Sequence, residues 1–137
     1  MFIWLTIFAN ELAITFDDLP SAENGAVDKQ QEINQKILNA LKKYRAPAIG
    51  FVNEINLVRK KPEETAKLIE ILKMWVTNGH ELGNHTYSHK FLSRTKMEQF
   101  KNDVIKGSEI SKKLSDDANR PYRYFRHPYL DRGRTPK

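Results

Sequence analysis

The sequence predicts an α/β protein whose strands form a parallel sheet or barrel. Short apolar runs alternate along the chain with segments in which apolar residues recur at the helical period. The 137 residues suffice for one domain with a buried core, and no internal repeat is visible. The polar residues that could carry chemistry follow the apolar runs. In parallel folds, chemistry gathers at these carboxyl ends of the strands.

The first half of the chain predicts two strands and two helices. A run such as Leu-Ala-Ile-Thr-Phe is typical of a strand that is buried on both faces. Asp28 is expected to cap the first helix, Pro62 to open the second, and Gly79 to stop it. The expected elements are strands over 12–16 and 48–52, a helix over 28–44, and a helix from 62 to about 79.

The second half is expected to add a short strand, a long helix and a fourth strand. The segment 81–84 predicts an extended piece that leads into a pair of histidines. Thr95 and Glu98 have the spacing of a capping box, and the helix they would start keeps its apolar period as far as Leu114. The run 123–125 is the candidate for the fourth strand.

The first eleven residues allow two interpretations. Met1 to Ala9 are almost wholly apolar, as in a secretory signal, but neither a basic leader nor a clear cleavage site accompanies them. The stretch is too short to cross a bilayer, and no transmembrane segment is expected. Residues 1–11 are therefore a signal-peptide remnant or a leading strand. The first implies a secreted, periplasmic or cell-envelope protein, and the second leaves a cytoplasmic location open.

Composition excludes some chemistry and limits the partners. The chain has no cysteine, which rules out a disulfide framework, a cysteine nucleophile and a thiolate metal site. Its net charge is +6, and residues 29–137 carry all 23 basic side chains against 12 acidic ones. The basic residues are scattered, which favours a solvated face over a nucleic-acid partner. Aromatic and basic residues alternate loosely over 122–125, and a strand explains them better than a stacking platform.

The first chemical cluster is the pair Asp17 and Asp18 at the end of the first expected strand. Adjacent residues of a strand point to opposite sides, so one carboxylate could bind a metal while the other acts as a base. A turn at the end of a strand would also explain two aspartates.

The second cluster contains His85 and His89. Four-residue spacing would place both imidazoles on one side of a helical turn, as a metal with nitrogen ligands requires. Two surface histidines in a loop are the alternative. His80 and Glu81 suggest a zinc-protease helix, but Asn84 stands where that motif needs its second histidine, so His80 is expected to be structural.

The third cluster is Arg126-His127-Pro128-Tyr129. An arginine can hold a carboxylate in a two-pronged hydrogen bond. Pro128 stiffens the backbone beside Tyr129, whose N–H could face a reacting oxyanion. An ordinary basic turn is the alternative.

In this order, the three clusters resemble the motifs of the polysaccharide deacetylase family, also called carbohydrate esterase family four or the chitooligosaccharide deacetylase homology domain. The matching segments are 15–18 for the first motif, 79–84 with 85–89 for the second, and 126–129 for the third. The similarity extends from Leu12 to Tyr129, so 12–137 is expected to be the N-terminal part of a polysaccharide deacetylase-like domain.

The resemblance implies a distorted (β/α) barrel that removes N-acetyl groups from amino sugars of a polysaccharide or oligosaccharide. The bond cleaved is a carbon–nitrogen amide, not a peptide, and the partner is a glycan with N-acetylated amino sugars. Asp17 would be the general base, Arg126 would orient it, and the backbone N–H of Tyr129 would stabilise the oxyanion. The metal is implied to be zinc, or sometimes cobalt or nickel, with three ligands: Asp18, His85 and His89.

The resemblance also implies parts that these residues do not contain. In the family a histidine of a later motif acts as the acid, and another late segment lines the substrate pocket. We therefore expect a truncated, partial barrel that lacks its C-terminal strands, with an unfinished sheet edge open to self-association. The function is then that of a metal-dependent deacetylase. The alternative is a catalytically inactive remnant that binds metal or glycan without turnover. Nothing in the spacing supports His127 or His80 as a substitute acid.

Overall fold

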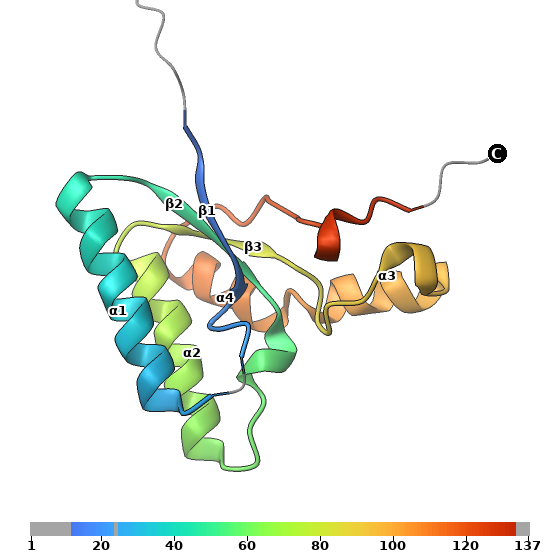
Figure 1. The fold of residues 1–137 in the computed structure, drawn as a ribbon, viewed down its shortest axis with the longest axis horizontal. Helices are drawn as coiled ribbons and strands as arrows, with labels where there is room; N and C mark the ends of the chain where they lie inside the picture. The colour runs from blue at the N-terminus through green and yellow to red at the C-terminus, as the bar shows by residue number, and fades with distance from the viewer. Residues whose placement is uncertain (1–11, 24, 134–137) are drawn as a thin grey trace, which may run out of the picture.

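The computed structural model describes residues 12–23 and 25–133, so the expected signal remnant or leading strand over 1–11 lies outside the described residues. Three parallel strands form its sheet in the order β1-β2-β3 (Figure 1). The main elements are β1 (Ile14–Leu19), α1 (Val27–Tyr44), β2 (Ala48–Val52), α2 (Pro62–Thr77), β3 (Glu81–Asn84), α3 (Met97–Lys106) and α4 (Glu109–Asp117). Spatial order equals chain order, so each crossover moves the chain one strand further in the same direction, as in a (β/α) barrel. The predicted α/β class is confirmed.

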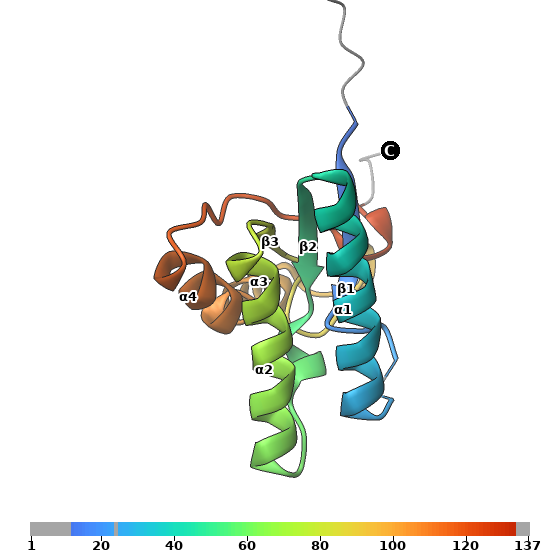
Figure 2. The same cartoon turned by 90° about the vertical axis from the view of Figure 1, so that its left-hand side faces the viewer.

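The core lies between the sheet and its helices, of which α1 and α2 lie side by side (Figures 1 and 2). Trp75 of α2 is fully buried, and its ring meets that of Phe16 of β1 edge-on, with centroids 5.3 Å apart. The indole N–H donates to Asn34 Oδ1 of α1 at 2.8 Å. Asn34 Nδ2 donates to the carbonyl of Pro20 at 2.8 Å. The buried side chains of Trp75 and Asn34 thus tie both helices to β1 and to the loop that follows it.

Helix α4 begins on a buried carboxyl group from a distant part of the chain. Glu54 lies in the 3-10 turn η1 (Glu54–Leu57) after β2 and is 2% exposed. Its Oε1 accepts the N–H groups of Ile110 and Ser111 at 2.9 and 2.8 Å, and the Ser111 hydroxyl at 2.7 Å. These N–H groups belong to the first turn of α4 and have no partner within the helix, so Glu54 takes the place of a local N-cap.

The expected long helix after residue 95 is two helices, α3 and α4. They are separated at Gly107, whose Cα lies so close to the loop after β3 that a Cβ there would stand 2.5 Å from backbone atoms of Thr86 and Tyr87. The predicted capping box is also wrong. The Thr95 hydroxyl donates to the carbonyl of Phe91 at 2.6 Å, and the N-cap position of α3 is held by the residue after Thr95.

Two other boundaries differ from the prediction. Helix α1 begins at Val27 with Ala26 at its N-cap, so Asp28 lies in the first turn and pairs with Lys67 of α2 at 3.0 Å. Strand β1 begins at Ile14 and continues through both aspartates. Within the described part of the chain, no helix combines the length and apolar character needed to span a bilayer.

The run 123–125 is an extended segment with a single bridge to β3 and not a full strand. Asn84, the last residue of β3, pairs with Phe125. The N–H of Asn84 donates to the carbonyl of Tyr124, and the N–H of Arg126 donates to the carbonyl of Asn84, both at 2.9 Å. This pairing places Arg126 at the carboxyl end of β3.

Candidate metal centre

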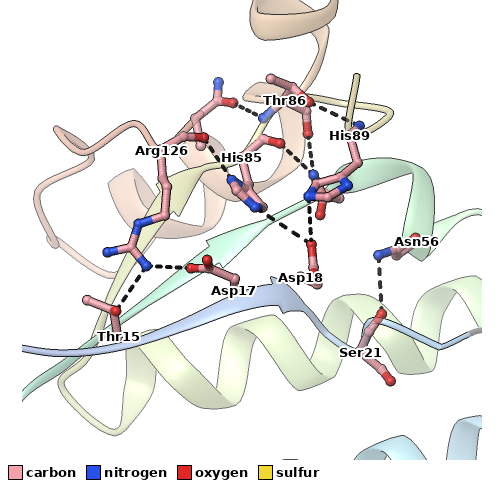
Figure 3. Close-up of polar contacts among 11 residues, drawn as sticks. Thr15, Asp17, Asp18, Ser21, Asn56, His85, Thr86, His89 and Arg126 are labelled. Atoms are coloured by element: carbon pink, nitrogen blue, oxygen red, sulfur yellow. Dashed lines mark hydrogen bonds and ion pairs between the residues drawn. The ribbon is translucent and has the colours of Figure 1, made fainter. Parts of the chain in front are cut away.

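The two aspartates lie in a bulge near the carboxyl end of β1. The register against β2 shifts between Phe16 and Leu19, and Asp18 has a φ of 61°. A regular strand would turn adjacent side chains to opposite faces. The bulge instead brings both carboxylates to the side of β1 that faces His85 and Arg126 (Figure 3). The expected opposite orientation of Asp17 and Asp18 is therefore wrong, although the two carboxylates do contact different partners.

His85 and His89 lie in the loop after β3 and not on the helical turn that their spacing suggested. Thr86 and His89 have φ values of 65° and 55°, a region that a β-branched residue enters only when its surroundings impose it. Asn84 Oδ1 accepts the N–H of Thr86 at 2.7 Å, and Thr86 Oγ1 accepts the N–H of His89 at 3.1 Å. The loop thereby curls until the two imidazole centroids lie 4.9 Å apart.

Two buried polar side chains hold this loop from outside. Asn53, 1% exposed, donates to the carbonyls of His85 and Thr86 at 2.5 and 3.2 Å. Asp103 of α3 accepts the N–H and the hydroxyl of Ser88 at 3.0 and 2.6 Å. Neither was expected from the sequence. Asp103 could have been noticed as an acid within the apolar stripe of a predicted helix, whereas Asn53 carries no local signal.

Asp18, His85 and His89 each offer one ligand atom, and these atoms lie within 4.8 Å of one another. Asp18 Oδ1 lies 3.7 Å from His85 Nε2 and 3.4 Å from His89 Nε2 (Figure 3). Ligands about 2.0–2.1 Å from a tetrahedral zinc ion stand roughly 3.3 Å apart. The three side chains therefore fit a divalent metal and leave coordination positions open.

The surroundings of His85 leave the lone pair of its Nε2 available to bind a metal. Its Nδ1 lies 2.7 Å from the carbonyl oxygen of Arg126. A carbonyl can only accept, so Nδ1 carries the proton and the Nε2 lone pair is free to face Asp18. Burial lowers the pKa of His85, which favours the neutral imidazole that metal binding requires.

Arg126 contacts Asp17, the carboxylate that the family resemblance implied it would orient. Its Nη1 donates to Asp17 Oδ1 at 2.6 Å and to Thr15 Oγ1 at 3.0 Å (Figure 3). The guanidinium lies 4.2 Å from the ring centroid of Phe51, in a cation–π contact. The two acceptors and the ring fix the guanidinium, which in turn fixes the carboxylate of Asp17.

Tyr129 lies in the 3-10 turn η3 (Pro128–Leu130) with a φ of 58°. Its ring centroid is 4.4 Å from that of His89 and 3.7 Å from that of Phe91. The structure thus gathers all six residues singled out from the sequence at the carboxyl ends of β1 and β3. The clustered residues are Asp17, Asp18, His85, His89, Arg126 and Tyr129.

The other two histidines pack against aromatic rings. His80 precedes β3, at the end of the strand opposite the metal candidates, is 5% exposed and meets Trp75 edge-on. His127 contacts the rings of Phe100 and Phe125, with centroids 6.0 and 4.7 Å away. The structural role expected for His80 agrees with this position, and neither histidine gains support as an acid.

Parallel strands with an Asp-His-His group at their carboxyl ends define an α/β protein with a candidate divalent-metal site. The family model described as polysaccharide deacetylase matches residues 9–136, and the chain belongs to the polysaccharide deacetylase family. The family predicted from the three motifs is therefore confirmed.

Similar proteins and a similar solved structure carry the names of deacetylases. The chain is 33% identical over 119 residues to a peptidoglycan-N-acetylglucosamine deacetylase of Bacillus cereus, covering 87% of this chain and 36% of that protein. It is 36% identical over 104 residues to the peptidoglycan-N-acetylmuramic acid deacetylase PdaC of Bacillus subtilis, covering 76% of this chain and 19% of that protein. A crystal structure of a peptidoglycan N-acetylglucosamine deacetylase superimposes with a TM-score of 0.63 at 30% identity, covering 87% of this chain and 46% of the other. The chain thus spans less than half the length of these relatives.

Proposed function

We propose that this protein is a metal-dependent hydrolase that removes acetyl groups from N-acetylated amino sugars of a glycan. The observation that carries the proposal is that two groups of residues lie side by side at the carboxyl ends of the strands. One is the metal-fitting group of Asp18, His85 and His89, and the other is the Arg126–Asp17 pair beside it. Relatives named for deacetylation of peptidoglycan and chitin support the substrate class.

The metal would be held by Asp18, His85 and His89. Zinc suits two imidazole nitrogens and one carboxylate oxygen with open positions, and cobalt or nickel would accept the same set. A bound ion of this kind polarises a carbonyl group and lowers the pKa of water in its coordination shell.

The remaining residues act on the proton and on the developing charge. Asp17 would accept a proton from the attacking water as general base. Arg126 orients the Asp17 carboxylate through its 2.6 Å hydrogen bond. The backbone N–H of Tyr129 would donate to the carbonyl oxygen of the acetamide as negative charge develops there.

The glycan and the location follow from the same proposal. Relatives named for peptidoglycan deacetylation make peptidoglycan the first glycan to test, with chitin fragments as the second. A protein acting on such polymers would work in the cell envelope or outside the cell.

Metal content of the purified chain is the first test. We expect about one zinc per wild-type chain, as three converging ligands require, and little or none in His89→Ala. His127→Ala is the matched control, because it removes a histidine outside the three ligands and should keep the metal. A folded wild type that binds no metal would contradict the ligand assignment.

Acetate release is the second test, made on the zinc-loaded protein with N-acetylated peptidoglycan and chitin fragments. Asp17→Asn should keep the metal and lose about 10²–10⁴-fold in rate, the usual contribution of a general base. Chelation should abolish release and zinc should restore it. A protein that keeps its metal but releases no acetate from either glycan would instead be the non-catalytic binder.

A further inference from the structure

Two short turns beside the candidate site are joined by hydrogen bonds and by stacked aromatic rings. The turn η2 (Leu92–Arg94) follows the metal-ligand loop, and η3 carries Tyr129. Asp131 Oδ2 accepts both the N–H of Ser93 at 2.8 Å and its hydroxyl at 2.7 Å. The rings of Phe91 and Tyr129 stack 3.7 Å apart at an interplanar angle of 2°. We call these four residues, Phe91, Ser93, Tyr129 and Asp131, the inter-turn latch.

The aromatic part of the latch continues to the metal candidates. The Tyr129 ring also meets the ring of His89, with centroids 4.4 Å apart. The guanidinium of Arg94 lies 4.5 Å from the centroid of Phe91. A row of four side chains therefore joins η2, η3 and one proposed metal ligand, although η2 and η3 are about forty positions apart in sequence.

The backbone that the latch holds is unfavourable without support. Tyr129 and Leu130 of η3 have φ values of 58° and 54°, and each is a residue with a Cβ. Such conformations cost free energy, and they persist where surrounding contacts impose them. Asp131 Oδ1 also accepts the N–H of Gly133 at 3.0 Å, so the carboxylate joins η2 to the segment that directly follows η3.

We propose that Phe91, Ser93 and Asp131 are positioning residues that set the backbone N–H of Tyr129 against the metal ligands. The inference rests on the proposed function, in which this N–H donates to the developing oxyanion. An oxyanion donor works only within about 2.7–3.1 Å of its acceptor. A displacement of about 1 Å costs roughly 10²-fold in rate. The latch is the contact between the two turns that limits such a displacement.

The test compares Asp131→Ala and Phe91→Leu with wild type in acetate release and zinc content. We expect kcat to fall about 10- to 100-fold, as for a misplaced group, with KM and zinc content little changed. Phe91→Tyr keeps a ring to stack on Tyr129 and should restore most of kcat. Asp116→Ala is the matched control, because that aspartate pairs with Lys112 on the exposed face of α4.

A second readout does not depend on turnover. In ¹⁵N-labelled protein, Asp131→Ala and Phe91→Leu should shift the Tyr129 amide resonance and speed its hydrogen exchange, while the global unfolding transition stays in place. If wild type releases no acetate but these variants still move the Tyr129 amide, the proposed function fails and the positioning stands. If the Tyr129 amide and kcat are unchanged in both variants, the positioning role is overturned.

Discussion

At the scale of single residues, burial decides what the histidines can do. His85 is 2% exposed, yet its Nδ1 has a carbonyl partner, so its other nitrogen remains available. His80 is 5% exposed, and neither of its ring nitrogens has a hydrogen-bond partner among the described residues. Burial, together with the positive charge of Arg120, lowers the pKa of His80 from its ordinary value of 6.5. A protonated His80 would therefore be costly in the folded chain.

The lowered pKa of His80 predicts a loss of stability in mild acid. Below about pH 6.5 the imidazole of His80 binds a proton in the unfolded chain, whereas in the folded chain it stays neutral until a lower pH. Above that pH the imidazole is neutral in both states, so it does not make the unfolding free energy depend on pH. The unfolding free energy should therefore fall between about pH 7 and 5, by at most about 1.4 kcal/mol per pH unit from this group.

His80→Phe removes the titration and keeps a ring against Trp75. Its stability should depend less on pH than that of wild type in urea unfolding with a chelator present, which prevents bound metal from contributing. Equal slopes in the two proteins would show that His80 does not titrate differently on folding.

The residues of the candidate site were predictable, but their geometry was not. The types and spacings of Asp17, Asp18, His85 and His89 suggested a metal site but left a turn and surface histidines open, and the resemblance of the three clusters to the family implied the role of each residue. The bulge at Asp18 and the left-handed turn at Thr86 depend on pairing with β2 and on buried partners elsewhere. Asn53, which holds the loop from a distant part of the chain, leaves no local pattern.

At the scale of elements, helical and strand periods predicted the three strands of the sheet and the first two helices, since these depend on local apolar patterns. The expected fourth strand is only a single bridge to β3. The break between α3 and α4 depends on the close approach of Gly107 to the loop after β3, which is distant in sequence. The N-terminus of α4 depends on Glu54, more than fifty residues earlier. Local helix propensity predicts neither the approach of Gly107 to the loop nor the contact of Glu54 with α4.

The capping role of Glu54 predicts a large stability loss in Glu54→Ala. The substitution leaves the N–H groups of Ile110 and Ser111 and the Ser111 hydroxyl without their acceptor in a buried place. We expect a loss of about 2–4 kcal/mol in unfolding free energy, measured by urea titration. Glu54→Gln keeps one acceptor oxygen and should lose less.

Glu70→Ala is the control for this experiment. Glu70 forms an exposed pair with Lys73, so its removal should change stability by less than about 0.5 kcal/mol. An Ala variant at 54 as stable as the Ala variant at 70 would contradict the capping role.

At the scale of the whole molecule, one face beside the sheet combines the extended segment 123–125 with exposed apolar side chains. The segment 123–125 borders β3 through a single bridge. Phe125 is 40% exposed and Ile105 67% exposed, and both line a hollow of about 350 Å³ whose other residues include Phe100 and Val104. Exposed apolar patches of this kind favour association.

This face predicts self-association that grows with protein concentration. Ile105→Lys places a charge beside the hollow without touching the metal candidates, and it should shift the protein toward monomer in sedimentation velocity. Tyr44→Lys is the matched control, because Tyr44 is 72% exposed at the end of α1 and lies outside this face. If the wild type stays monomeric over the whole accessible concentration range, this face does not associate. If both variants reduce association equally, added positive charge and not the apolar face is responsible, since the chain already carries +6.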